Sequence, residues 1–127
     1  MNVMLPTYKP VLTRVNPIHH DGKKYIVAVG GRIYSKRFDK WVDVHHGMES
    51  DGATGAFDLK DSWSWLVHDK LCDACCWEDL TPCTAEQASQ LLSDILHVEG
   101  YEIRRYTWEW ATFLFGSWKL KRKVGWV

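Results

Sequence analysis

The hydrophobic pattern of this 127-residue chain changes its period near residue 61, and this change limits the possible folds more than any other feature. Before it, short stretches of β-branched and aromatic residues alternate between two faces, which predicts strands. After it, apolar residues recur three and four positions apart, the spacing that places them on one face of a helix. Strands followed by helices predict an α+β fold.

We expect the strands to form one small antiparallel sheet. The predicted strands are "VLTRV" (11–15), "KKYIVAV" (23–29), "RIYSKRF" (32–38) and "KWVDVHH" (40–46). In the last of these the alternation places Trp41, Asp43 and His45 on one face and Val42, Val44 and His46 on the other. The Gly30-Gly31 pair interrupts the apolar run and predicts a turn between two of the strands.

Three helices are expected after residue 61. In the first, "DSWSWLVHDKLCDACCW" (61–77), Asp61 is the predicted N-cap. One face of this helix carries Trp65, His68, Cys72 and Cys75. The second helix has the clearest boundaries, because Thr84 and Gln87 have capping-box spacing and Gly100 supplies a stop. Its apolar stripe consists of Leu91, Leu92, Ile95 and Val98.

The third predicted helix, "YEIRRYTWEWATFLFG" (101–116), is apolar nearly all round. A helix without a polar face is buried on several sides, by its own domain or by another subunit. We therefore expect a protein partner or self-association through residues 101–118. The chain is too short for two domains, so the prediction is a single domain over 1–127, strand-rich in 1–50, helical in 61–118 and with a basic tail in 119–127.

Composition excludes several classes of function. Lys and Arg together equal Asp and Glu, so no net positive charge favours nucleic acid as a partner. No segment approaches the roughly 18 uninterrupted apolar residues expected of a membrane-spanning helix. The N-terminus "MNVMLPTYKP" lacks the pattern of a signal peptide. A reducing cytosol is therefore the expected location, where cysteines are thiols or metal ligands.

All four cysteines lie in "LVHDKLCDACCWEDLTPC" (66–83). Cys72 and Cys75 have C-x-x-C spacing, Cys83 follows after a turn, and His68 lies one helical turn before Cys72, which together suggest a structural zinc site. The alternative is packing, because free cysteine is often buried as a small hydrophobe and a second well-spaced ligand pair is missing.

A second candidate site combines the loop "ESDGATGAFD" (49–58) with the His68-Asp69 pair. Asp51 on this loop and His68 on the helix would suit a divalent metal, or a base oriented by its neighbour. Consecutive helical residues point about 100° apart, so Asp69 cannot share one tight site with His68 without a helix end or a bend. The histidine is therefore expected to face Asp51, with Asp69 left for a supporting or helix-to-sheet contact. A structural turn and a hydrogen-bonded core histidine are the alternatives.

These segments resemble a family of tailed bacteriophages and prophages described as domain of unknown function 1353. The resemblance rests on "SDGATGA" (50–56), "SWLVHDKLC" (64–72) and "GYEIRRYTWEWATFLFG" (100–116), and covers roughly residues 45 to 117. It implies a phage origin and a polar cluster of Asp51, Thr54, His68 and Asp69. Thr54 stands where the family has serine. Ala88-Ser89 stands where many members have Ala-Asp, which leaves Asp94 as a substitute for that carboxylate.

Two functions follow as hypotheses. The first is a bacteriophage accessory protein with a hydrolase-like site at Asp51, Thr54, His68 and Asp69, either metal-dependent or using His68 as the base. The second is a non-catalytic head or tail component, or a protein that binds host machinery through the Trp-rich segment 101–118. Both place the protein in the host cytoplasm, with incorporation into the virion as a further option for the second.

Overall fold

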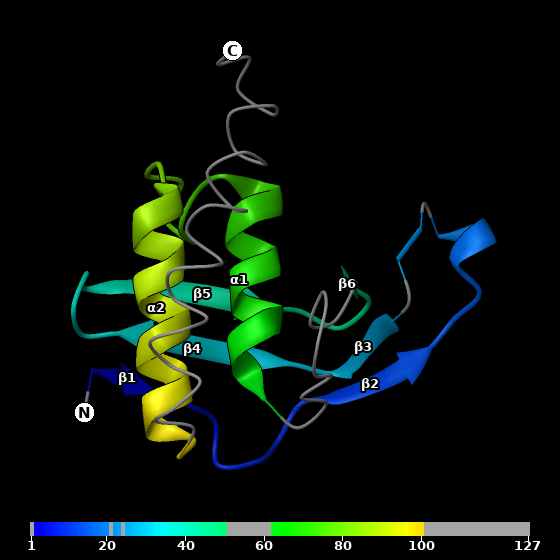
Figure 1. Cartoon of the computed structure of the whole chain (residues 1–127), viewed down its shortest axis with the longest axis horizontal. Helices are drawn as coiled ribbons and strands as arrows, with labels where there is room; N and C mark the ends of the chain where they lie inside the picture. The colour runs from blue at the N-terminus through cyan, green and yellow to red at the C-terminus, as the bar shows by residue number, and fades with distance from the viewer. Residues whose placement is uncertain (1, 21, 24, 51–61, 101–127) are drawn as a thin grey trace.

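The computed structural model describes residues 2–20, 22–23, 25–50 and 62–100 (Figure 1). The predicted helix 101–116, the basic tail and loop residues 51–61 lie outside this range. The described elements are β1 (Val3–Met4), β2 (Val11–Arg14), the 3-10 helix η1 (Pro17–His19), β3 (Tyr25–Val29), β4 (Gly31–Ser35), β5 (Lys40–Val44), β6 (Glu49–Ser50), α1 (Trp63–Ala74) and α2 (Ala85–Val98). The predicted α+β class is confirmed.

The strands form two antiparallel sheets, so the prediction of one small sheet is wrong. One sheet has the order β1-β4-β5 and the other the order β2-β3-β6. The predicted turn at Gly30-Gly31 is instead the point where the chain leaves one sheet and enters the other. A Cβ atom on Gly30 would lie 1.8 Å from the carbonyl oxygen of Val44. Glycine is needed there because two backbones approach closely, not because the chain reverses.

Alternation along β4 and β5 decides which sheet face the helices cover. Val42 and Val44 are buried, whereas Trp41 on the opposite face is 40% exposed, as the period of two predicts. Helices α1 and α2 lie side by side in front of this sheet (Figure 1). The core lies between these layers, and its largest fully buried side chains include Ile33, Val42, Val44, Leu66, Leu71, Leu91, Leu92 and Ile95.

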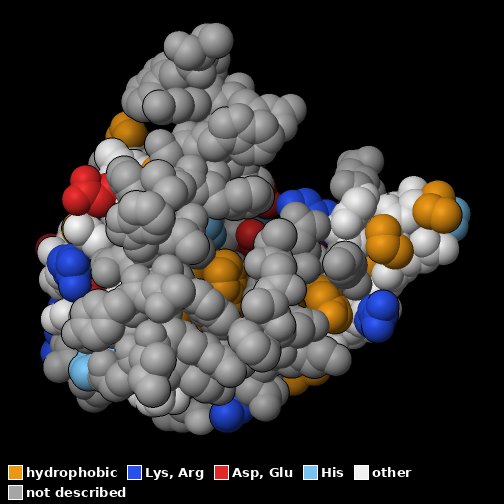
Figure 2. All heavy atoms as spheres, in the orientation of Figure 1, with side chains coloured by type: hydrophobic (Ala, Val, Ile, Leu, Met, Phe, Trp, Pro, Cys, Tyr) orange, Lys and Arg blue, Asp and Glu red, His pale blue; other side chains and the backbone are white. Residues whose placement is uncertain are grey.

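The β2–β3 hairpin extends away from the helices and carries η1 at its tip (Figure 1). Apolar side chains are visible along this arm in Figure 2. Ile18 in η1 is 85% exposed, and the paired residues Val11 and Val29 are also exposed. The other strand partner of β3 is β6, through Tyr25 opposite Ser50 and Ile26 opposite Glu49. Through this pairing the arm is joined to the short strand that leads toward α1.

Helix α1 is shorter at both ends than its sequence predicts. Its N-cap is Ser62 and not Asp61: the Ser62 hydroxyl accepts the Ser64 N–H at 3.1 Å. Cys75 ends the helix in the left-handed conformation, with φ of 59°. Residues 75–77 then run antiparallel to 81–83, with a bridge between Cys76 and Pro82. The apolar spacing alone could not show that the chain leaves the helix at this point.

Helix α2 agrees with its prediction at both ends. The Thr84 hydroxyl accepts the Gln87 N–H, and the Gln87 side chain accepts the Thr84 N–H, each at 3.1 Å. The predicted stripe is buried at Leu91, Leu92 and Ile95. Gly100 follows the helix with φ of 89°. Neither helix in the described part of the chain has the length and apolar character needed to cross a membrane.

Candidate functional site

A buried hydrogen bond joins the end of β6 to α1. The Ser50 hydroxyl donates to Oδ2 of Asp69 at 2.6 Å, and both side chains are buried, with Asp69 only 7% exposed. Asp69 therefore makes a helix-to-sheet contact. Since Ser50 directly precedes Asp51, this bond anchors the chain one residue before the predicted loop site. Asp51 and Thr54 themselves lie outside the described residues.

His68 lies on a different face of α1 and is 4% exposed. Its ring meets Trp65 edge-on, with ring centroids 6.2 Å apart, and both ring nitrogens are 3.8 Å from the Cys72 sulfur. These three residues occupy the i, i+3 and i+7 positions that the helical period predicts. Of the predicted polar cluster, the structure thus describes His68 and Asp69, and the helix directs them apart.

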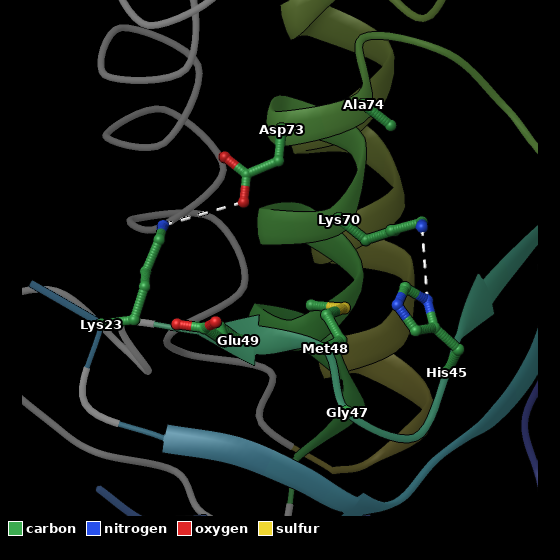
Figure 3. Close-up of a pocket in the computed structure, with 8 residues that line it drawn as sticks. All are labelled: Lys23, His45, Gly47, Met48, Glu49, Lys70, Asp73 and Ala74. Carbon is green, nitrogen blue, oxygen red and sulfur yellow. Dashed lines mark hydrogen bonds and ion pairs between the residues drawn. The ribbon is translucent and has the colours of Figure 1, made fainter. Parts of the chain in front are cut away.

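A pocket of about 490 Å³, with four charged side chains in its lining, lies between β6 and α1 (Figure 3). It is bounded by Lys23 before β3, by the segment from β5 to β6, and by the C-terminal half of α1. The residues that line it include Lys23, His45, Met48, Glu49, Lys70 and Asp73. Glu49 precedes Ser50, and Asp73 lies one helical turn after Asp69, so the buried bond adjoins the pocket wall.

Charged groups line both sides of this pocket. Lys23 Nζ lies 3.7 Å from an Asp73 carboxylate oxygen, and Lys70 Nζ lies 3.4 Å from His45 Nδ1. Outside the pocket, His20 approaches Glu49 at 3.4 Å. The sequence did not predict this site, because Lys23, His45 and Lys70 come from three separate segments and no spacing rule links them. The one sequence signal was the lysine that directly follows the His68-Asp69 pair.

None of the four cysteines forms a disulfide; Cys72 and Cys83 are buried, and the other two are partly buried. Burial, with smaller contributions from the other three thiols, raises the pKa of Cys83 to about 12. Without a bound metal, Cys83 is therefore a protonated thiol near neutral pH. Among the described residues, no group of three or more His, Cys, Asp or Glu side chains is placed to hold a metal ion. The zinc hypothesis gains no support from this part of the chain.

Asp94 was expected to replace the carboxylate that many members of the phage family have in this helix. In the structure it pairs with Arg37. An Arg37 Nη2 donates to its Oδ1 at 2.7 Å, and the Asn2 side-chain amide approaches the same oxygen at 3.4 Å. The Asp94 side chain is fully buried. Asn2 directly precedes β1 and Arg37 lies in the β4–β5 turn, so Asp94 fixes α2 to the edge of the first sheet.

The comparisons with known proteins reveal no relative. No family model, no curated protein and no solved structure matches the chain. The resemblance to the phage family remains a prediction from the sequence.

Proposed function

We propose that the chain is a small bacteriophage accessory protein with a hydrolase-like site at the junction of β6 and α1. The observation that supports this most is the buried bond from Ser50 to Asp69. It links the start of the loop that carries Asp51 and Thr54 to the helix that carries His68. A catalytic group is effective only when its backbone is held rigidly, and this bond supplies such an attachment.

The proposal assigns a role to each residue of the predicted cluster. Asp51 is the carboxylate that orients the reacting water or a divalent metal ion, and His68 is the general base. Thr54 donates a hydrogen bond to the substrate. Asp69 acts as a positioning residue, because its Oδ2 already accepts from Ser50 and its side chain is buried.

The pocket between β6 and α1 lies next to the proposed site, and its described lining includes neither His68 nor Asp69. Its volume of about 490 Å³ matches the size range of small-molecule sites, and polar groups line it on both sides. The phage origin follows from the sequence resemblance, and the location in the host cytoplasm follows from that resemblance together with the N-terminal pattern and the cysteines.

Activity against chromogenic carboxylic esters and phosphodiesters tests the proposal. We expect hydrolysis by the full chain, and a loss of about 100-fold or more in Asp51→Asn, the range for a positioned acid–base group. His68→Gln should lose activity to a similar degree, and Asp69→Asn to a smaller one. Assays with EDTA and with added Mg²⁺ or Mn²⁺ separate the metal-dependent route from the histidine-base route.

The control is Asp43→Asn, which removes a carboxylate from β5 on the sheet face that carries Trp41. This variant should retain full activity. Melting temperatures decide how a loss of activity is interpreted. If Asp51→Asn and His68→Gln lose activity only because they unfold, the cluster is a structural network and the proposal is wrong.

A second candidate function is a non-catalytic virion or host-binding protein. It is favoured by the segment 101–118, where Trp108, Trp110 and Trp118 accompany several other aromatic residues. Such residues are enriched at protein interfaces. This segment lies outside the described residues, and the association state of the full chain tests the idea.

A further inference from the structure

The pocket beside β6 brings two nitrogen donors together from separate elements. Lys70 Nζ extends from α1 and lies 3.4 Å from Nδ1 of His45, which follows β5 (Figure 3). An ammonium group can donate hydrogen bonds but cannot accept them. The contact therefore exists only when Nδ1 of His45 is unprotonated, and two protonated groups at this distance would repel. In that tautomer Nε2 carries the ring proton, so an anion in the pocket would accept hydrogen bonds from Lys70 Nζ and from the Nε2–H of His45.

Both donors are attached to well-held backbone. Lys70 lies on α1, one residue after Asp69, whose carboxylate is bonded to Ser50. The turn after β5 is held by two backbone bonds, from Gly47 N–H to Val27 O at 2.9 Å and from Met48 N–H to His45 O at 3.2 Å. Gly47 has φ of 89°, a conformation that favours glycine. The backbone that carries the two side chains therefore loses little conformational freedom when a ligand binds.

The two carboxylates of the pocket lie on its other side. Figure 3 shows Lys23, Glu49 and Asp73 on one side of Met48, and Lys70 and His45 on the other. Asp73 is 3.7 Å from Lys23, and Glu49 is 3.4 Å from His20. Within the described parts of the chain, no ion pair joins Lys70 to a carboxylate. The positive charge of Lys70 is thus available to a ligand.

We propose that this pocket binds a small phosphate monoester that carries hydroxyl groups. Lys70 Nζ and the His45 ring each donate to a phosphate oxygen, and Met48 forms the apolar floor. The hydroxyl groups lie toward Asp73 and Glu49, whose carboxylates accept hydrogen bonds from them. A phosphate fits better than a carboxylate, because its three terminal oxygens can accept from the Lys70 ammonium and from the His45 ring N–H at the same time. This binding does not require the hydrolytic chemistry proposed for Asp51 and His68.

Titration of the full chain with inorganic phosphate and with glycerol phosphate tests the site. Amide chemical shifts are followed by NMR at constant ionic strength, with sodium chloride and sodium acetate as reference anions. We expect saturable shifts at His45, Gly47 and Lys70 with a Kd of about 1 mM for phosphate, and tighter binding of glycerol phosphate. Acetate that binds as tightly as phosphate would overturn the proposal.

Charge-matched variants separate a specific site from general attraction. Lys70→Gln and His45→Gln should each weaken phosphate binding about tenfold, whereas Lys36→Gln, in the exposed β4–β5 turn, should change it less than twofold. Equal weakening by Lys70→Gln and Lys36→Gln would show that only net charge matters, and the site would not exist. Asp51→Asn, which should lose most of its hydrolytic activity, is expected to bind phosphate normally. Failure of the binding site and failure of the hydrolase proposal are thereby distinguished.

Discussion

Three buried or partly buried acidic side chains each connect segments that are distant in the sequence. Asp69 bonds to Ser50, Asp94 bonds to Arg37, and Glu99 accepts hydrogen bonds from Ser62 and from the backbone of Trp63. A buried carboxylate is destabilising unless it is hydrogen-bonded or paired, so each contact is needed in the folded state. These contacts attach β6 to α1, the β4–β5 turn to α2, and the end of α2 to the start of α1.

The Ser50–Asp69 bond should contribute measurably to stability. We expect Ser50→Ala to lower the free energy of unfolding by roughly 1–3 kcal/mol, because a buried carboxylate loses a donor. In urea denaturation, the double variant Ser50→Ala with Asp69→Ala should then lose less stability than the sum of the two single variants. Strict additivity would mean that the two side chains do not interact in solution.

Glu99 should make the stability depend on pH. Burial raises its pKa above the ordinary 4.5, although hydrogen bonds from Ser62 and Trp63 and the charge of Lys9 act in the opposite direction. The folded state therefore holds this proton more tightly than the unfolded state. The stabilisation from the protonated Glu99 is fully present below the pKa that Glu99 has in the unfolded state. It is lost as the pH rises through the pKa of Glu99 in the folded state.

The variant Glu99→Gln isolates this effect. Its amide cannot ionise, so the difference in unfolding free energy between wild type and variant should shift against the wild type as pH rises from about 4 toward neutrality. Urea denaturation at a series of pH values measures that difference. A difference that stays constant with pH would contradict the assignment to Glu99.

The sequence predicted single residues well where one element determines their position. The divergence of His68 and Asp69 followed from the helical period alone, and so did the shared face of Trp65, His68 and Cys72. The partner of Asp69 could not be predicted, because Ser50 is 19 residues away and reaches it only through the packing of β6 against α1. The pocket around Lys70 depends on the same packing and was missed for the same reason.

At the level of elements, both described helices and the longer strands were predicted, but the arrangement of the strands was not. Alternation identifies which face of a strand is buried and contains no information about which strand pairs with it. A glycine pair between two apolar runs suggested a hairpin. Here Gly30 instead allows β3 to continue into β4 across two sheets, at the point where Val44 approaches the backbone.

Gly30→Ala should disrupt the connection from β3 to β4. The added Cβ would lie 1.8 Å from the Val44 carbonyl oxygen, a backbone atom that moves only if β5 shifts. We expect a loss of about 3 kcal/mol in the free energy of unfolding, at the upper end of the range for overpacking.

The comparison is Gly47→Ala, which has no heavy atom within 4 Å of the new Cβ but a φ of 89°. That variant should lose only about 1 kcal/mol, from backbone strain. Equal losses in thermal and urea unfolding would show that Gly30 is not under steric restriction.

At the scale of the whole molecule, the described residues form a two-layer α+β body, with a hairpin arm on one side and a pocket between β6 and α1. Formal charges balance across the full chain, so association with a partner depends on apolar surface more than on net charge. Four of the eight tryptophans, at 108, 110, 118 and 126, lie after the described residues. An apolar segment of this kind is the strongest sequence-based argument for self-association.

Sedimentation velocity of the full chain over a wide range of concentration tests this argument. We expect a reversible oligomer, since aromatic residues that cover several faces of a helix favour burial against a second copy. Trp110→Ala should weaken the association at least tenfold, the effect of a tryptophan at the centre of an interface. Trp41→Ala is the matched control: Trp41 is exposed on β5 and stacks with Arg32 at 4.2 Å within its own chain, so its loss should leave the association unchanged. A monomer at every concentration would rule out self-association through residues 101–118, and an equal effect of the two substitutions would place the interface elsewhere.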